Sequence, residues 1–407
     1  MTELQPNQVA PKPSSKIPAY AWTLIALLVG MGLGGTLPDV LAPVATGTGM
    51  LIRVIVAVVP ILILAALSPA IATLLRRGLG GRFAGAVLLW YVASSALAGL
   101  IGLIISSLIF RIPISLESTG SVAQATNMFR AFGEQTGASI PLVAIVAAVF
   151  VGIAALWSKS LYAVLSRIER AIAGIGDKMG YVMVPLILLF GISLGVRFGA
   201  RLGLRHYLTM TLYTAALCCI WWLFYVFVIV RLVARRSPGR VISQYYLPTA
   251  IFAAGTCSSL ATLPVNLANV KRYGVRDEVA DFVLPFGAVV NLDASTLMYV
   301  AYAPFVLTHV FGIEVSWTML LVAWPALVLF TIAAPGLPAG IGTALWSATL
   351  FSSMVGLEGQ EQSDFVATWI ALSGGLPDML RTATNCTGDG FTALMFDRFF
   401  HRFRDRE

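Results

Sequence analysis

Five polar residues occur at helical spacing within an apolar stretch near the end of the chain. They are Asp378, Arg381, Thr382, Asn385 and Asp389, in the string DMLRTATNCTGD. At about 100° per residue, all five fall within about 100° of one helix face. Charges at membrane depth cost at least about 2.5–3.5 kcal/mol each and normally face protein or a wet cavity. The spacing therefore favours a polar binding surface over the alternative, a structural network of ion pairs between helices.

The composition is typical of a polytopic helical membrane protein. Of its 407 residues, 58% are hydrophobic and only 11% are charged, whereas a soluble protein carries about 25% charged residues. Long unbroken apolar runs predict spanning helices and exclude a barrel, whose strands would be short and alternating. The net charge of +8 is explained by basic residues in short loops, as the positive-inside rule requires, and not by a nucleic-acid partner. We expect a multi-pass protein in the lipid bilayer of the cell's inner (plasma) membrane, with both termini cytoplasmic.

Six apolar segments precede the more broken second half of the chain. They are about 19–37, 50–75, 83–110, 141–165, 181–203 and 207–233. The first segment lacks a small-residue cleavage site, so we interpret it as a retained helix and not as a signal peptide. Arg197, Arg201 and Arg205 do not fit the charge pattern, because they would lie near the outer side of the membrane.

Two apolar runs are interrupted by small residues and proline. The run 241–273 breaks at GTCSSLATLP (255–264), and the run 317–354 breaks at APGLPAGIG (334–342). Each could be a re-entrant hairpin, which is tolerated in a membrane only where protein or a cavity covers it. A pair of such breaks indicates a transporter site near the bilayer midplane. The alternative is two ordinary helices kinked by Gly and Pro.

The string PFGAVVNLDAS lies between the two runs and ends at Ser295. Its Asn291 and Asp293 are costly in an apolar helix, and hard cations prefer carboxylate, amide and carbonyl oxygens. If the helix unwinds at this point, its carbonyls become further ligands. An interrupted run followed by a helix with Asn and Asp occurs twice, as an imperfect internal repeat.

An enzyme is the least favoured class. The scattered cysteines and histidines show no metal-ligand spacing, no disulfide framework and no nucleophile–base arrangement. An aspartyl enzyme needs two carboxylates that share a proton. Asp378 and Asp389 would lie about 16 Å apart along one helix, although Asp293 could approach one of them.

The chain resembles the dicarboxylate/amino acid:cation symporter family, which includes glutamate and aspartate transporter homologues. The resemblance extends over nearly the whole chain and is most specific in SSLATLPV, PFGAVVNLDAS, GLPAG and DMLRTATNCTGD. It implies an all-α polytopic membrane protein with eight transmembrane segments, two re-entrant hairpins, a homotrimeric assembly and an elevator mechanism.

The resemblance also implies a division into a static scaffold and a moving transport domain. The expected parts are a disordered cytoplasmic tail (1–16), scaffold helices 1–2 (17–78), transport-domain helix 3 (79–111), scaffold helices 4–5 (112–205), the remaining transport domain (206–401) and a cytoplasmic tail (402–407).

The same resemblance assigns substrate-binding roles. Arg381 would hold the side-chain carboxylate of the substrate, since its guanidinium suits bidentate binding. Asp378, with Thr382, would accept the amino group, and Asn385 would bind the main-chain carboxylate. The other substrate-site residues implied are Ser258, Ser259, Ser295 and Pro338.

Three cation sites follow from the resemblance in the same way. Asp389 would hold one cation with carbonyls of Gly287, Asn291 and Asn385. A second site would combine Asp293 with Asn291, Tyr91, Ser94 and Ser95. A third would use the carbonyls of Val289, Thr331, Ile332 and Ala334.

The resemblance predicts sodium-coupled uptake of aspartate or glutamate, because Asp378 suits a substrate with an amino group and both Asp293 and Asp389 are retained. Departures from the family pattern include Leu292 for methionine and Ala294 for glycine. The alternatives are proton coupling, a dicarboxylate or neutral amino acid carrier on the same fold, and a channel.

Overall fold

The computed structural model describes most of the chain, and all regular secondary structure in the described residues is helical. The described residues are 19–48, 50–51, 82–113, 147–148, 150–332 and 341–401, with isolated positions from 61 to 72. The first helices are α1 (Ala19–Thr36), α3 (Arg82–Ile109), α6 (Lys159–Leu223), the π-helix η1 (Phe224–Val233), α7 (Pro238–Val241) and η2 (Ile242–Tyr246). They are followed by α8 (Leu247–Thr256), α9 (Ser259–Tyr273), α10 (Asp277–Val290), α11 (Asp293–Pro304), η3 (Phe305–Val310), α12 (Trp317–Ile332), α13 (Ile341–Met354), α14 (Gly359–Ser373) and α15 (Leu376–Phe399).

Three helical stretches in the described part of the chain are long and apolar enough to cross a membrane: Arg82–Ile109, Gly203–Val233 and Asp277–Val310. Shorter apolar helices cover Ile25–Thr36, Val184–Gly199 and Trp317–Thr331. The predicted segment 50–75 lies mostly outside the described residues, so the count of eight spans stays a prediction.

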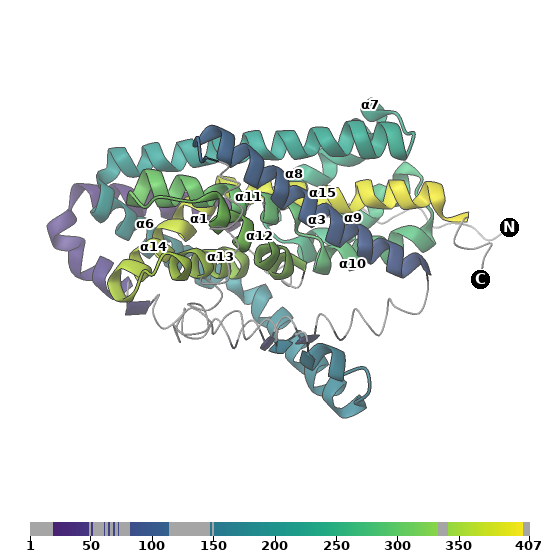
Figure 1. The fold of residues 1–407 in the computed structure, drawn as a ribbon, viewed down its shortest axis with the longest axis horizontal. Coiled ribbons are helices and arrows are strands. Elements are labelled where there is room, and N and C mark those ends of the chain that lie inside the picture. Colours follow the sequence, from purple (N-terminus) through teal and green to yellow (C-terminus); the bar gives the residue numbers. More distant parts are fainter. Residues whose placement is uncertain are drawn as a thin grey trace.

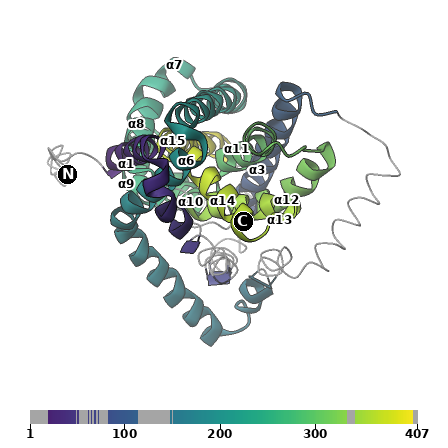
Figure 2. The ribbon, with the colours of Figure 1, turned by 90° about the vertical axis from the view of Figure 1, so that its left-hand side faces the viewer.

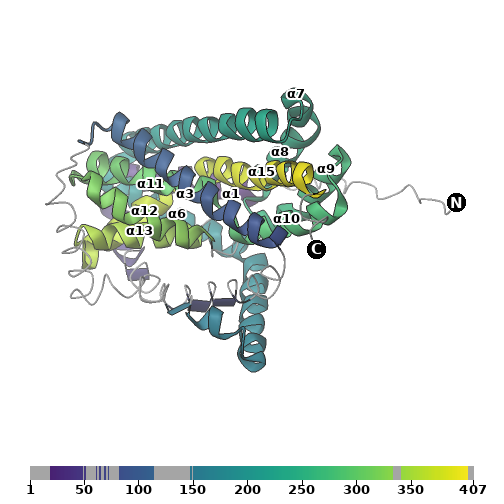
Figure 3. The same cartoon turned by 45° about the vertical axis from the view of Figure 1, so that its right-hand side comes forward.

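Helix α15 lies along the long axis of the molecule, in the middle of the bundle (Figure 1). It contacts α6, η1, α8, α9, α10, α11 and α14, and the view down the bundle shows it enclosed by them (Figure 2). The interrupted run α8–α9 lies near the end of the bundle where α15 terminates, and α12–α13 lies toward the other end (Figure 3). The helix with the polar stripe is thus the central element.

The helices break at the positions that the sequence marked with small or polar residues. Between α8 and α9 the chain turns at Cys257, whose φ of 48° and ψ of 30° are left-handed, and the two helices pack against each other. Between α10 and α11 the chain unwinds at Asn291 and Leu292, as predicted for the NLD string. Of the predicted break in the second run, 334–340 lie outside the described residues, and 341–342 begin α13.

A further break, not predicted, separates α14 from α15 at Gly374 and Gly375. Gly375 has a φ of 64° and a ψ of −122°, a conformation that a residue with a Cβ rarely adopts. The polar helix therefore begins at Leu376, only two residues before Asp378.

One long helix, α6, extends from the end of the fourth predicted segment through the fifth into the sixth, which η1 completes. It has a kink at Gly199 (φ 71°, ψ 159°). The kink lies four residues before the expected end of segment five at 203. Next to it, Arg197 forms an ion pair with Asp364 of α14 at 2.6 Å, and its guanidinium carbon lies 4.4 Å from the centre of the Phe311 ring. This contact accounts for one of the three arginines that did not fit the charge pattern.

Glycines allow α1 and α6 to approach each other closely. Gly30 and Gly34 of α1 lie against Gly191 and Gly195 of α6, so that backbone meets backbone. Small residues four apart are typical of close helix packing in membranes, where van der Waals contact drives association. This contact fixes α1 onto the part of α6 that precedes the Gly199 kink.

Substitution of Gly34 by alanine is expected to destabilise the protein. The added Cβ would fall on the Ile192 carbonyl and 2.9 Å from the amide nitrogen of Val196. Overpacking of this kind costs about 1–3 kcal/mol. Gly32→Ala is the matched control, because a Cβ there meets nothing within 4 Å. A lower unfolding midpoint in detergent is expected for Gly34→Ala alone, and equal midpoints for the two variants would contradict the packing.

Candidate functional site

The five residues of the polar stripe all face the protein interior. Asp378, Arg381 and Asp389 are each 2% exposed, Asn385 is 4% exposed and Thr382 is 6% exposed. Burial of a charged group is tolerated only with a partner. The partners of these side chains therefore define the site.

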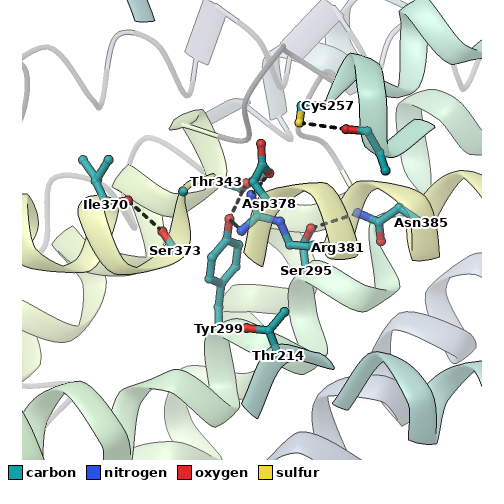
Figure 4. A network of polar contacts seen from close by, with 12 residues as sticks. Thr214, Cys257, Ser295, Tyr299, Thr343, Ile370, Ser373, Asp378, Arg381 and Asn385 are labelled. Atoms are coloured by element: carbon teal, nitrogen blue, oxygen red, sulfur yellow. Dashed lines mark hydrogen bonds and ion pairs between the residues drawn. The ribbon is translucent and has the colours of Figure 1, made fainter. Parts of the chain in front are cut away.

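Arg381 and Asp378 form an ion pair one turn apart on α15. The same guanidinium donates a hydrogen bond to the hydroxyl of Tyr299 on α11 and lies over that ring, 4.9 Å from its centre. The Tyr299 hydroxyl is also 2.9 Å from Thr343 Oγ1 on α13. Figure 4 shows Arg381 between Asp378 and Tyr299. The acid–base pair is thus connected to the second interrupted run through one tyrosine.

The first interrupted run contacts the same face of α15 with its turn. The thiol of Cys257 donates to the Ala254 carbonyl within this turn at 3.4 Å, and the buried Ser259 hydroxyl lies 3.6 Å from the sulfur of Cys386 on α15. Ser258 is also buried, and its carbonyl accepts a 2.7 Å hydrogen bond from Thr262. Ser259 therefore contacts α15 next to Asn385 of the stripe, at a cysteine that the sequence did not single out.

Asn385 connects α15 to the start of α11. Its Nδ2 donates to Ser295 Oγ at 3.1 Å, and its Oδ1 accepts from the amide of Ala294 at 3.0 Å. Asn385 thereby shares with the Asp293 carboxylate a backbone N–H at the start of α11, where the break leaves the first N–H groups without intrahelical carbonyl partners. The structure places both Asn385 and Ser295 beside the acid–base pair (Figure 4).

Oxygen atoms surround Asp389 at the break between α10 and α11. Asn291 Nδ2 donates to the Asp389 carboxylate at 3.0 Å. Gly287 lies so close that a Cβ there would overlap both this carboxylate and the Tyr91 hydroxyl. Within the described residues, the buried Asn291 Oδ1 has no hydrogen-bond partner. The Asp389 carboxylate, Asn291 Oδ1 and the Tyr91 hydroxyl form an oxygen-lined cradle that suits a hard cation.

Asp293 is held mainly by aromatic donors. Its Oδ2 accepts from Tyr225 Oη at 2.5 Å and from Trp221 Nε1 at 3.0 Å, and its Oδ1 accepts from the Ala294 amide at 2.8 Å. Ser94, which was predicted to share this site, donates to the Tyr91 carbonyl one turn earlier on α3 at 3.2 Å, and its role at the site stays a prediction. The sequence analysis missed Tyr225 and Trp221; their spacing of four along an apolar helix was the available signal.

The predicted third cation site is described only in part. Thr331 Oγ1 is 2.5 Å from Thr296 Oγ1 and also contacts the Leu327 and Val328 carbonyls. The backbones of Val289 and Ile332 belong to α10 and α12. Ala334 and Pro338 lie outside the described residues.

In the part of the chain that the structure describes, no two of the buried carboxylates are joined by a hydrogen bond. Asp378 pairs with Arg381, Asp389 accepts from Asn291, and Asp293 accepts from aromatic donors. A shared proton between two carboxylates, which an aspartyl enzyme needs, has no counterpart in these contacts.

The chain belongs to the sodium:dicarboxylate symporter family, whose model matches residues 19–399. This is a family of membrane transporters and not of enzymes. The proton/glutamate-aspartate symporter of Escherichia coli K12 is 30% identical over 183 residues, which cover 44% of this chain and 40% of that relative.

Two animal relatives give similar matches. Human excitatory amino acid transporter 1 is 32% identical over 179 residues, covering 43% of this chain and 31% of the relative. The glt-6 protein of Caenorhabditis elegans, described as a sodium-dependent excitatory amino acid transporter, is 28% identical over 176 residues, covering 43% and 30%. The chain thus matches less than half the length of each of these three relatives.

The two contacts between Tyr299 and Arg381 can be separated by substitution. Tyr299→Phe removes the hydroxyl and keeps the ring under the guanidinium, and we expect a loss of about 1–3 kcal/mol from the donor left unpaired. Tyr299→Leu also removes the cation–π contact, worth up to about 2 kcal/mol when desolvated. Unfolding midpoints without added amino acids should therefore fall in the order wild type, Phe, Leu. A Phe variant as stable as wild type would show that Arg381 does not depend on the hydroxyl.

Proposed function

We propose that this protein is a secondary active symporter that takes up an acidic amino acid, aspartate or glutamate, together with sodium. The observation that carries the proposal is the buried ion pair of Asp378 and Arg381 on the central helix. A substrate with one ammonium group and an additional carboxylate carries one charge of each sign for this pair. Each of these charges could replace one partner of the Asp378–Arg381 ion pair.

The exchange preserves charge balance at each buried group. The side-chain carboxylate of the substrate would take the place of Asp378 at the Arg381 guanidinium, and the ammonium group would take the place of Arg381 at Asp378. Guanidinium–carboxylate contacts can be bidentate and are among the stronger hydrogen bonds in proteins. Asn385, one turn after Arg381 on α15, would bind the main-chain carboxylate together with Ser295 of α11. Ser258 and Ser259 would cover this carboxylate. Neither buried charge is left alone at any stage, which avoids a penalty of about 3–5 kcal/mol.

The cradle at Asp389 supports coupling to a small hard cation. A sodium ion there would receive the Asp389 carboxylate, the unpaired Asn291 Oδ1 and backbone carbonyls near Gly287 and Asn385. It would also neutralise a carboxylate that is 2% exposed. Asp293 is proposed for a second cation with Tyr91, Ser94 and Ser95. A proton is the alternative partner, and the relatives include proteins named for either coupling.

The remaining parts of the proposal concern the whole assembly. We propose eight spanning segments with two re-entrant hairpins, α8–α9 and α12–α13, in a plasma-membrane protein whose termini are cytoplasmic. The transport domain would comprise α3 and residues 206–401. It would move as an elevator against a trimeric scaffold built from 17–78 and 112–205. Two observations support this arrangement. The chain belongs to the symporter family, and its helices break at Cys257 and at Asn291–Leu292.

Uptake of labelled L-aspartate into proteoliposomes tests the function directly. An inward sodium gradient is expected to drive accumulation above equilibrium, because symport links substrate entry to the fall of sodium down its gradient. Liposomes without protein, and potassium in place of sodium, are the controls. Accumulation that requires a proton gradient and does not depend on sodium would show that protons, and not sodium ions, are coupled to uptake. No accumulation under either gradient would overturn the proposed function.

Arg381→Ala tests the substrate class. We expect the concentration for half-maximal aspartate uptake to rise at least about 100-fold, because charge-assisted hydrogen bonds of about 1.5–3 kcal/mol each are lost. Uptake of neutral amino acids should not fall in parallel. Arg197→Ala is the matched control, since that arginine pairs with Asp364 away from the stripe. Unchanged aspartate uptake by Arg381→Ala would show that this arginine does not bind the side-chain carboxylate of the substrate.

A further inference from the structure

The start of α15 lacks a side-chain cap of its own. Its N-cap residue is Gly375, which has no side chain to accept a hydrogen bond from the first backbone N–H groups. Unsatisfied N–H groups in a membrane interior cost several kcal/mol each. The acid–base pair lies within the first two turns after this end, at Asp378 and Arg381, so that any displacement of the helix start displaces both charges.

Tyr207 of α6 supplies the missing partner from a different helix. Its side chain is buried, with 1% exposed. Its hydroxyl oxygen accepts from the amide of Leu376 at 2.9 Å, and its proton is donated to the carbonyl of Gly374 at 3.3 Å. One hydroxyl therefore bridges both sides of the break between α14 and α15.

We propose that Tyr207 is a positioning residue for the substrate site, a role that rests on the proposed function. It acts through the backbone and not by contact with the substrate. By holding Leu376 and Gly374 together, it fixes where Asp378 and Arg381 stand relative to Tyr299 of α11 and to the turn at Cys257. Since binding of a zwitterion needs both charges at once, a shift of about 1 Å at the helix start lowers affinity strongly.

Another tyrosine of α6 provides a matched control. The hydroxyl of Tyr213 is buried and has no hydrogen-bond partner among the described residues, and its ring packs on Phe110. Tyr207→Phe and Tyr213→Phe therefore remove the same atom from the same helix. Only Tyr207→Phe removes hydrogen bonds to the break between α14 and α15.

The test measures the kinetics of sodium-driven aspartate uptake for both variants and the wild type. Tyr207→Phe should raise the apparent KM for aspartate about 10-fold, because two hydrogen bonds of modest strength are lost, while the maximal rate per folded protein stays within about two-fold. Tyr213→Phe should match wild type in both. A purely structural role would lower the yield of folded protein and leave the apparent KM for aspartate unchanged.

Hydrogen exchange gives a second readout that does not need transport. Backbone amides in 374–381 should exchange faster in Tyr207→Phe than in wild type, and Tyr213→Phe should not differ from wild type. An unchanged KM for Tyr207→Phe in a protein that transports aspartate, or unchanged exchange at this segment, overturns the positioning role alone. Failure of the wild type itself to take up aspartate overturns the proposed function, and the positioning role with it.

Discussion

The structure depends on how two opposite charges are kept inside an apolar bundle. Removal of an ion from water costs several kcal/mol even after relaxation, and a pair recovers this only with good geometry and further hydrogen bonds. Asp378 and Arg381 meet these conditions together with Tyr299. The requirement explains why α15 occupies the centre of the bundle, where other helices enclose it on the faces that would otherwise meet lipid.

The same rule governs the backbone. Each break in a helix exposes N–H and C=O groups that lipid cannot satisfy, and side chains close to the stripe supply the missing partners. Asn385 accepts from the Ala294 amide, Tyr207 from the Leu376 amide, and Thr256 Oγ1 from the Ser258 amide. Asn385 of the site, with Tyr207 and Thr256 close to the stripe, therefore makes these breaks tolerable. Because these side chains satisfy backbone groups at the breaks, we expect few substitutions to be tolerated at their positions.

The sequence predicted the features that depend on local spacing. The periodicity of the stripe placed five residues on one buried face, and the string NLD marked the unwound point of the helix, because Asn and Asp are costly in an apolar run unless a break or a site uses them. Features that depend on distant partners were not predictable. Tyr299, Trp221 and Tyr225 are common aromatic residues in apolar helices, and Arg197 finds Asp364 at a separation of 167 positions. The break at Gly374–Gly375 was missed because glycines also occur within continuous membrane helices.

The contacts also supply a physical route by which a cation and a substrate could influence each other. Asn291 donates to Asp389 on one side of the unwound point, and Ala294 donates to Asn385 on the other side, three residues later. A cation at Asp389 would fix Asn291 and so order the connection that sets Asn385 and Ser295. Contiguous contacts of this kind carry coupling only if the connecting element has two states that both ligands bias. The non-helical connection at Asn291 and Leu292 joins the two contacts, and it is therefore the element of this site best suited to that role.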